Sequence, residues 1–111
     1  EGQDAVAAVL QGIRNLSGLT ENLTVQVESH SDSSPVVKLK KKFATNWELS
    51  GARAFSVVRT LETLGLSGRV LSGAGFGSSR PVSDVSSRNR RIVFQLRFKP
   101  QYSTTLKVAQ R

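Results

Sequence analysis

The sequence contains no cysteine, no methionine and a single histidine, His30. Without cysteine, disulfide bonds and thiolate metal sites are excluded, and the redox state of the compartment leaves no mark on the sequence. One imidazole and a few carboxylates do not supply the ligand set that a zinc site needs. We therefore expect no metal and no other cofactor.

Long hydrophobic runs are also missing. No segment approaches the roughly 18 apolar residues that span a bilayer, and the opening EGQDAVAAVLQG lacks the basic and then apolar order of a signal peptide. Because the chain begins with Glu1 and not with methionine, we expect a piece of a longer polypeptide whose targeting or membrane segments lie elsewhere. Its 111 residues, 38% hydrophobic and 22% charged, have the size and composition of one globular domain.

Acidic residues are scarce. Eight Asp and Glu stand against sixteen Lys and Arg, which gives a net charge of +8 and favours polyanionic partners. The basic clusters KLKKK, residues 38–42, and RNRR, residues 88–91, are each either a solvated segment or an electrostatic contact. Few aromatic residues that stack on bases lie near them, so a basic nucleic-acid-binding domain is the alternative that we favour less.

Two segments have the periodicity of helices. Apolar residues recur three and four apart over residues 4–17. A second helix is predicted from Thr45, where Thr45 and Glu48 form a capping box, and Gly65 supplies the left-handed residue that ends it. Ser50 is a competing cap that would shift the start by about one turn.

Three segments are predicted to form strands. Residues 24–30 and 91–98 alternate apolar with polar side chains, and the second is expected to lie centrally in a sheet. Residues 69–76 form a strand weakened by glycine. This order of elements predicts the α/β class, as a two-layer α+β sandwich with two main helices packed on a small mixed sheet. We expect residues 1–98 to form the domain and residues 99–111 to be an extended or disordered C-terminal extension.

Two short motifs suggest chemistry that the rest of the sequence does not support. HSD, residues 30–32, lies among serines, but no G-x-S-x-G elbow is present, and a catalytic triad is assembled in space and not from chain neighbours. GAGFG, residues 73–77, loosely resembles a phosphate-binding loop, but Ser-Ser-Arg-Pro follows where a helix should open. We expect a binding domain and not an enzyme.

The stretch NWELSGARA, residues 46–54, places polar side chains beside an apolar stripe. On a helix Asn46, Ser50 and Arg53 share one edge, because they are four and three residues apart. Asp32 follows the strand 24–30, and ligands of open α/β sheets collect beyond the carboxyl ends of strands. Asp32 and Arg53 would then suit a zwitterion, the acid binding its ammonium and the guanidinium its carboxylate. The alternative is that the two residues pair with each other or cap a loop.

Four motifs in this order carry a resemblance to a known family. HSD, NWELSGARA, GAGFGSSRP and NRRIVFQL resemble the G-H-T-D strand end, N-x-x-L-S-x-x-R-A helix, G-[YF]-G turn and N-R-R strand of the OmpA-like C-terminal domain family, the peptidoglycan-binding module of OmpA, Pal and MotB. The resemblance covers residues 24–96. Residues 46–54 look most similar to MotB-type members.

The resemblance implies non-covalent binding of the peptidoglycan stem peptide through diaminopimelate, with no bond made or broken. By motif, Asp32 would bind the ammonium, Arg53 the carboxylate, and Asn46 would help to fix the same group. The implied protein is periplasmic. By the same resemblance, it would anchor a larger membrane-tethered protein to the cell wall.

The remaining ligand-binding candidates come from the ends of the same motifs. Arg90 and Arg91 border the family's pocket, and Arg91 ranks lower because strand alternation can aim it elsewhere. His30 and Ser31 adjoin Asp32 in the HSD motif.

The sequence also departs from the family. Ser29 replaces Gly, Ser31 replaces Thr, and residues 84–89 form a shorter segment than usual, which leaves open a degenerate member used for protein contacts. The family begins with a strand before the first helix, which this sequence lacks; either that strand was trimmed or another segment supplies the sheet edge. An unpaired sheet edge favours pairing between chains, so a homodimer is a further expectation.

Overall fold

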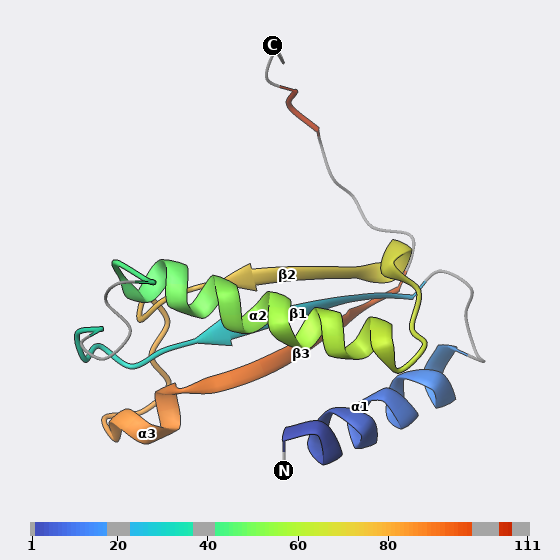
Figure 1. Cartoon of the computed structure of the whole chain (residues 1–111), viewed down its shortest axis with the longest axis horizontal. Helices are drawn as coiled ribbons and strands as arrows, with labels where there is room; N and C mark the ends of the chain where they lie inside the picture. Colours follow the sequence, from blue (N-terminus) through green and yellow to red (C-terminus); the bar gives the residue numbers. More distant parts are fainter. Residues whose placement is uncertain (1, 18–22, 37–41, 99–104, 108–111) are drawn as a thin grey trace.

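The computed structural model describes residues 2–17, 23–36, 42–98 and 105–107. In chain order the elements are α1 (Gly2–Ser17), β1 (Thr24–His30), α2 (Asn46–Thr63), the 3₁₀ turn η1 (Gly68–Val70), β2 (Leu71–Gly75), α3 (Ser86–Asn89) and β3 (Arg91–Arg97). Helix α2 runs along the strands and α1 lies beside its second half (Figure 1). This two-layer arrangement confirms the predicted fold class.

The sheet has the strand order β2-β1-β3. Strand β1 pairs with β2 in parallel and with β3 in antiparallel orientation, so the sheet is mixed, as predicted. The prediction that β3 lies centrally is wrong, because β1 is the central strand and β3 is an edge. The apolar alternation of β3 reflects one face that packs on the core through Phe94 and Leu96, and it does not report on neighbours at the strand's edges.

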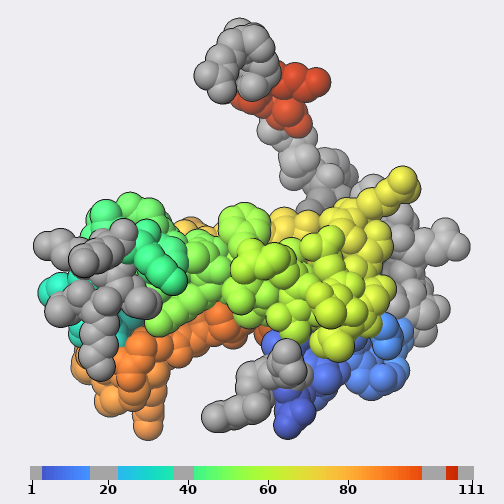
Figure 2. All heavy atoms as spheres, viewed as in Figure 1, coloured from blue at the N-terminus to red at the C-terminus, as the bar shows by residue number. Residues whose placement is uncertain are grey.

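The core lies between the helices and the sheet, and Leu71 of β2 and Phe94 of β3 pack against it from either side of β1. Val25 and Val27 of β1 are only 1% and 0% exposed. Leu10 and Ile13 reach them from α1, and Ala54 and Leu61 lie in the same core from α2. Both helices therefore bury their apolar stripes against one face of the sheet. In the space-filling view α2 spans the middle of this face, with the orange α3–β3 segment and α1 below it (Figure 2).

Helix α2 begins where its capping residue predicts. Thr45 is the N-cap, and its hydroxyl oxygen accepts from the backbone N–H of Trp47 at 3.2 Å. The Glu48 carboxylate accepts from the Thr45 hydroxyl, and not from the Thr45 backbone N–H as a capping box would have it. At the other end Gly65, with φ of 107°, turns the chain out of the helix.

Two local predictions differ from the structure. The strand expected over residues 69–76 begins at Leu71, because the Ser67 hydroxyl accepts from the Arg69 N–H and starts the turn η1 (Gly68–Val70). Helix α3 was not predicted, since four residues are too few to show a period. Most of KLKKK, residues 38–41, and residues 99–104 and 108–111 of the extension lie outside the described residues.

Strand β2 lies against the backbone of α2. A Cβ added at Gly75 would lie 2.3 Å from the Gly51 nitrogen and 2.6 Å from its Cα, and neither backbone atom can move aside. The substitution Gly75→Ala should therefore destabilise the fold by about 3 kcal/mol, because it overpacks a helix–strand contact. Urea unfolding followed by circular dichroism measures this difference.

The matched control is Gly12→Ala in α1, where nothing lies within 4 Å of the added Cβ. It should stabilise the protein by about 0.5–1 kcal/mol through helix propensity. Equal effects of the two substitutions would contradict the close packing of α2 on β2.

Candidate functional site

The loop that follows β1 is organised around the carboxylate of Asp32. One oxygen accepts from the backbone N–H of Ser34 at 2.9 Å, and the other accepts from the Arg90 guanidinium. The residue is 7% exposed, whereas half of the Arg90 side chain faces solvent. The Ser34 backbone hydrogen bond, and after it the Arg90 hydrogen bond, lower the pKa of Asp32 below its ordinary value of 3.8. Asp32 is therefore ionised at neutral pH.

Asn46 and Ser31 hold the backbone of this loop. The Asn46 amide donates to the carbonyl oxygens of Asp32 at 3.3 Å and of Ser34 at 3.0 Å. The Ser31 N–H donates to the carbonyl of Gly77 at 2.8 Å, and its buried hydroxyl has no partner among the described residues. The structure thus gives both side chains a place beside Asp32, with Asn46 acting as a brace.

The three polar side chains predicted to share one edge of α2 have different surroundings in the structure. Asn46 reaches the loop after β1, while Ser50 is 1% exposed and accepts from the Gly77 N–H at 2.9 Å. Only Arg53 turns toward an open pocket. The three residues do lie on one edge of the helix. Asn46 and Ser50, however, hold the loop after β1 and the turn after β2 in place.

That pocket, which we call the arginine pocket, has a volume of about 180 Å³ and lies at the carboxyl end of β1 beside the start of β3. Its lining residues are Ser29, His30, Arg53, Arg90, Arg91 and Ile92. Asp32 is not among them and adjoins the pocket through its ion pair with Arg90. The alternative in which Asp32 pairs with Arg53 is not what the structure shows, whereas Asp32 does cap its loop at Ser34.

The arginine pocket is strongly electropositive. None of its lining residues is acidic. The Arg91 guanidinium donates to the carbonyl oxygens of Arg80 at 3.1 Å and Asn89 at 3.5 Å, and Arg53 has no hydrogen bond or ion pair with any described residue. A guanidinium that is not neutralised and opens to a pocket is a ready binding group for a carboxylate.

His30 forms one wall of the pocket as a neutral ring. It stacks on Phe76 with centroids 5.0 Å apart, and the Arg80 guanidinium lies 4.1 Å from the Phe76 ring centroid. Burial first, and then the nearby Arg91 charge, lower the pKa of His30 below its ordinary value of 6.5, although Glu28 at 3.6 Å acts in the opposite direction. Sequence reasoning missed Phe76 and Arg80, because only the fold brings the turn after β2 to the end of β1.

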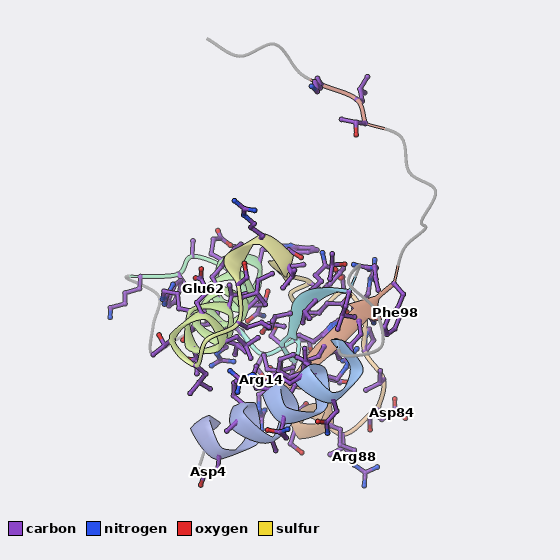
Figure 3. The ribbon with its side chains drawn as sticks, turned by 90° about the vertical axis from the view of Figure 1, so that its right-hand side faces the viewer. Asp4, Arg14, Glu62, Asp84, Arg88 and Phe98 are labelled. Carbon is purple, nitrogen blue, oxygen red and sulfur yellow. The ribbon has the colours of Figure 1, made fainter. Side chains whose placement is uncertain are left out.

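The RNRR cluster separates in space. Arg88 projects from α3 away from the body of the domain (Figure 3), while Arg90 and Arg91 line the pocket. Between them Asn89 is buried, and its amide oxygen accepts from the N–H groups of Val82 and Ser83 at 2.8 and 3.1 Å. Asn89 therefore positions both pocket arginines. The resemblance included this asparagine, but sequence reasoning did not give it a role.

A larger hollow, of about 500 Å³, lies between α1, α2 and β3. Its lining is mostly apolar and carries no charged group. The arginine pocket has the groups for specific recognition, so we place the candidate site there. Across residues 2–17, 23–36, 42–98 and 105–107, no group of three His, Cys, Asp or Glu residues gathers to hold a metal ion. None of the described helices is long and apolar enough to cross a membrane.

These features define a two-layer α/β binding domain with a basic pocket at the end of its central strand. The chain belongs to the OmpA family, whose model matches residues 2–93. The match begins in α1, well before the stretch in which the motifs were recognised. The family and the fold both agree with the resemblance seen in the sequence.

Known proteins are similar over most of the chain. Motility protein B of Helicobacter pylori is 26% identical over 90 residues, which are 81% of this chain and 34% of that protein, so the chain spans about a third of its length. The crystal structure of the C-terminal domain of H. pylori MotB superposes with a TM-score of 0.74 at 22% identity, over 87% of this chain and 76% of that one. At this identity the likeness concerns the fold.

A further structure is more similar in sequence. The cell wall anchor of the T6SS from Pseudomonas aeruginosa is 30% identical, with a TM-score of 0.61 over 85% of this chain and 66% of that one.

The burial of His30 predicts a pH-dependent stability. Because its pKa is lower in the folded than in the unfolded chain, the unfolded state takes up a proton first as pH falls. The contribution of His30 to the free energy of unfolding should therefore be complete above pH 6.5. It should fall as the pH decreases below 6.5 toward the pKa of His30 in the folded protein. Urea unfolding at a series of pH values, followed by circular dichroism, measures this slope.

His30→Gln cannot titrate and is the control. It should flatten the slope just below pH 6.5 and keep the loss that Asp32 causes below pH 3.8, where the unfolded Asp is the first to be protonated. An unchanged slope in His30→Gln would show that another group controls stability in the first window.

Proposed function

We propose that this domain binds peptidoglycan without making or breaking bonds, and that the arginine pocket holds the diaminopimelate of a stem peptide. The observation that carries the proposal is Arg53, a guanidinium with no partner among the described residues that lines an open pocket in a member of the OmpA family. The P. aeruginosa relative is described as a cell wall anchor, which supports the same assignment.

Arg53 supplies the carboxylate half of the clamp. Its fork can donate two parallel hydrogen bonds to one carboxylate, and no protein group has to be displaced first. Arg90 lines the same pocket and carries the ion pair with Asp32. A ligand carboxylate at Arg53 would thus lie in a field that no lining acid offsets.

Asp32 supplies the ammonium half. A carboxylate has about four lone-pair sites, and the structure shows two of them in use, by Ser34 and Arg90. A ligand ammonium that binds next to Arg90 would use the remaining capacity of a carboxylate that is already ionised. Asn46, Ser31 and His30 contribute by holding the loop and the pocket wall in place.

The same assignment suggests what kind of longer protein this domain belongs to. Motility protein B and the T6SS cell wall anchor are larger than this chain, and H. pylori MotB has a domain described as periplasmic. We accordingly propose a periplasmic domain that tethers a larger membrane-anchored protein to the cell wall. Pairing of two copies through an open sheet edge belongs to the same proposal.

Co-sedimentation with purified peptidoglycan tests the site. Arg53→Ala should reduce the affinity about tenfold or more, since one charge-assisted contact is lost. Arg53→Lys should recover only part of it, because an ammonium lacks the planar fork. Arg59→Ala is the matched control. It removes the same charge from an exposed position on the same helix, and Arg59 lines a separate hollow.

Circular dichroism must show that all variants are folded. Normal retention of a folded Arg53→Ala protein would refute the assignment of the pocket. Asp32→Asn should weaken retention too, while its amide oxygen remains available to cap Ser34.

Salt dependence separates this function from nucleic-acid binding. A polyanion bound through basic clusters releases many counterions, so its affinity should fall steeply with salt and survive Arg53→Ala. A single-pocket clamp should weaken only modestly between about 50 and 200 mM salt, and it should require Arg53. Steep, Arg53-independent binding to DNA or RNA would favour the alternative.

A further inference from the structure

The charges in the arginine pocket do not balance against a zwitterion. Three arginines line the pocket, and two acids lie behind its lining: Asp32, paired with Arg90, and Glu28, which is 3.6 Å from His30. Neither Arg53 nor Arg91 forms an ion pair with a described carboxylate. With Asp32 counted against Arg90 and Glu28 against a second arginine, one positive charge remains in excess.

A diaminopimelate head group leaves this excess in place. At the free D-centre of the diaminopimelate residue one ammonium and one carboxylate cancel, so the group that fills the Asp32–Arg53 clamp brings no net charge. Arg53 and Arg91 line the same open pocket, so their charges add, and a ligand with a second anionic group offsets the excess that remains. Net negative charge on the ligand is therefore favoured.

Arg91 is placed to receive the second anion. Its guanidinium is held by the carbonyl oxygens of Arg80 and Asn89, which fix its position without neutralising it. Two of its five N–H donors account for these bonds, and the others remain for a ligand. The contact with the backbone of the Asn89 loop thus orients Arg91 as a preformed half of an ion pair.

We infer that the pocket recognises a doubly anionic segment of the stem peptide, with Arg53 on the diaminopimelate carboxylate and Arg91 on a second carboxylate of the same stem. The inference rests on the proposed function and adds Arg91 as a specificity-determining residue. In a tripeptide stem the second carboxylate has two sources, the α-carboxylate of the γ-linked D-glutamate and the C-terminal carboxylate, which lies at the L-centre of diaminopimelate itself. Amidation of the correct one should weaken binding.

Calorimetric titration with synthetic stem peptides tests this. The probes are the tripeptide L-Ala-γ-D-Glu-meso-diaminopimelate, the same peptide amidated at D-glutamate, and the same peptide amidated only at the L-centre carboxylate of diaminopimelate. Loss of the Arg91 ion pair should raise Kd about tenfold for one of the two amides, and that amide identifies the carboxylate. Equal Kd values for all three peptides would overturn the inference and leave the diaminopimelate clamp standing.

For each variant we compare the Kd of the amidated peptide with the Kd of the free acid. Both values come from the same protein, so a change in folding does not affect their ratio. Arg91→Gln should bring the ratio of amide to free-acid Kd close to one, Arg91→Lys should keep most of it, and Arg59→Gln should leave it unchanged. An unaltered ratio in Arg91→Gln would exclude Arg91 as the residue that binds the second carboxylate. If no peptide binds the wild-type protein, the proposed function itself fails.

Inorganic phosphate is the alternative ligand to test, because a phosphate dianion can also bind two guanidinium groups. It should compete with the tripeptide only weakly, since it cannot use Asp32. Competition by phosphate as strong as that of the tripeptide would overturn the assignment of the pocket to a peptide dicarboxylate.

Discussion

A carboxylate removed from water needs hydrogen-bond donors on each of its oxygens, and in this domain that requirement organises the loop after β1. Asp32 is nearly buried, and the Ser34 N–H and the Arg90 guanidinium supply those donors. The first contact curls the loop and the second ties it to the start of β3. Because Arg90 lines the arginine pocket and precedes Arg91 in the chain, the shape of the pocket depends on this junction.

The junction also separates two kinds of arginine. Arg90 is a structural cation as well as a lining residue, because its charge is used inside the protein. Arg53 and Arg91 have no acidic partner among the described residues, and the scaffold holds their charges open to the pocket. If the pocket binds the proposed ligand, it would select by charge before shape, since the electrostatic contribution persists while the side chains adjust.

How far the sequence predicts this molecule depends on the range of the interactions. Thr45 and Gly65 predict the ends of α2, and the alternation of residues 24–30 predicts β1, because capping residues and hydrophobic periodicity are local signals. The central place of β1, and with it the edge position of β3, depends on which strands meet. No period encodes that. The short α3 and the turn η1 fall below the length at which a pattern is visible.

The site divides along the same line. The motifs supply residue types and helix spacing, so Asp32, Arg53, Asn46 and Arg90 are candidates from the sequence alone. The partner of Asp32 is not predictable in this way, because Arg90 lies 58 positions away and competes with Arg53 for the same acid. Only the packed structure decides that competition. The stacking of His30 on Phe76 is equally non-local.

The contact between Gly75 and Gly51 carries one more consequence. With no side chain between helix and strand, α2 rests on β2 backbone to backbone, and the position of the Arg53 Cα is fixed relative to the sheet. Little conformational entropy remains to be lost at the backbone when a ligand arrives. Recognition then resembles docking onto a rigid frame, with only the tips of the arginine side chains left to settle.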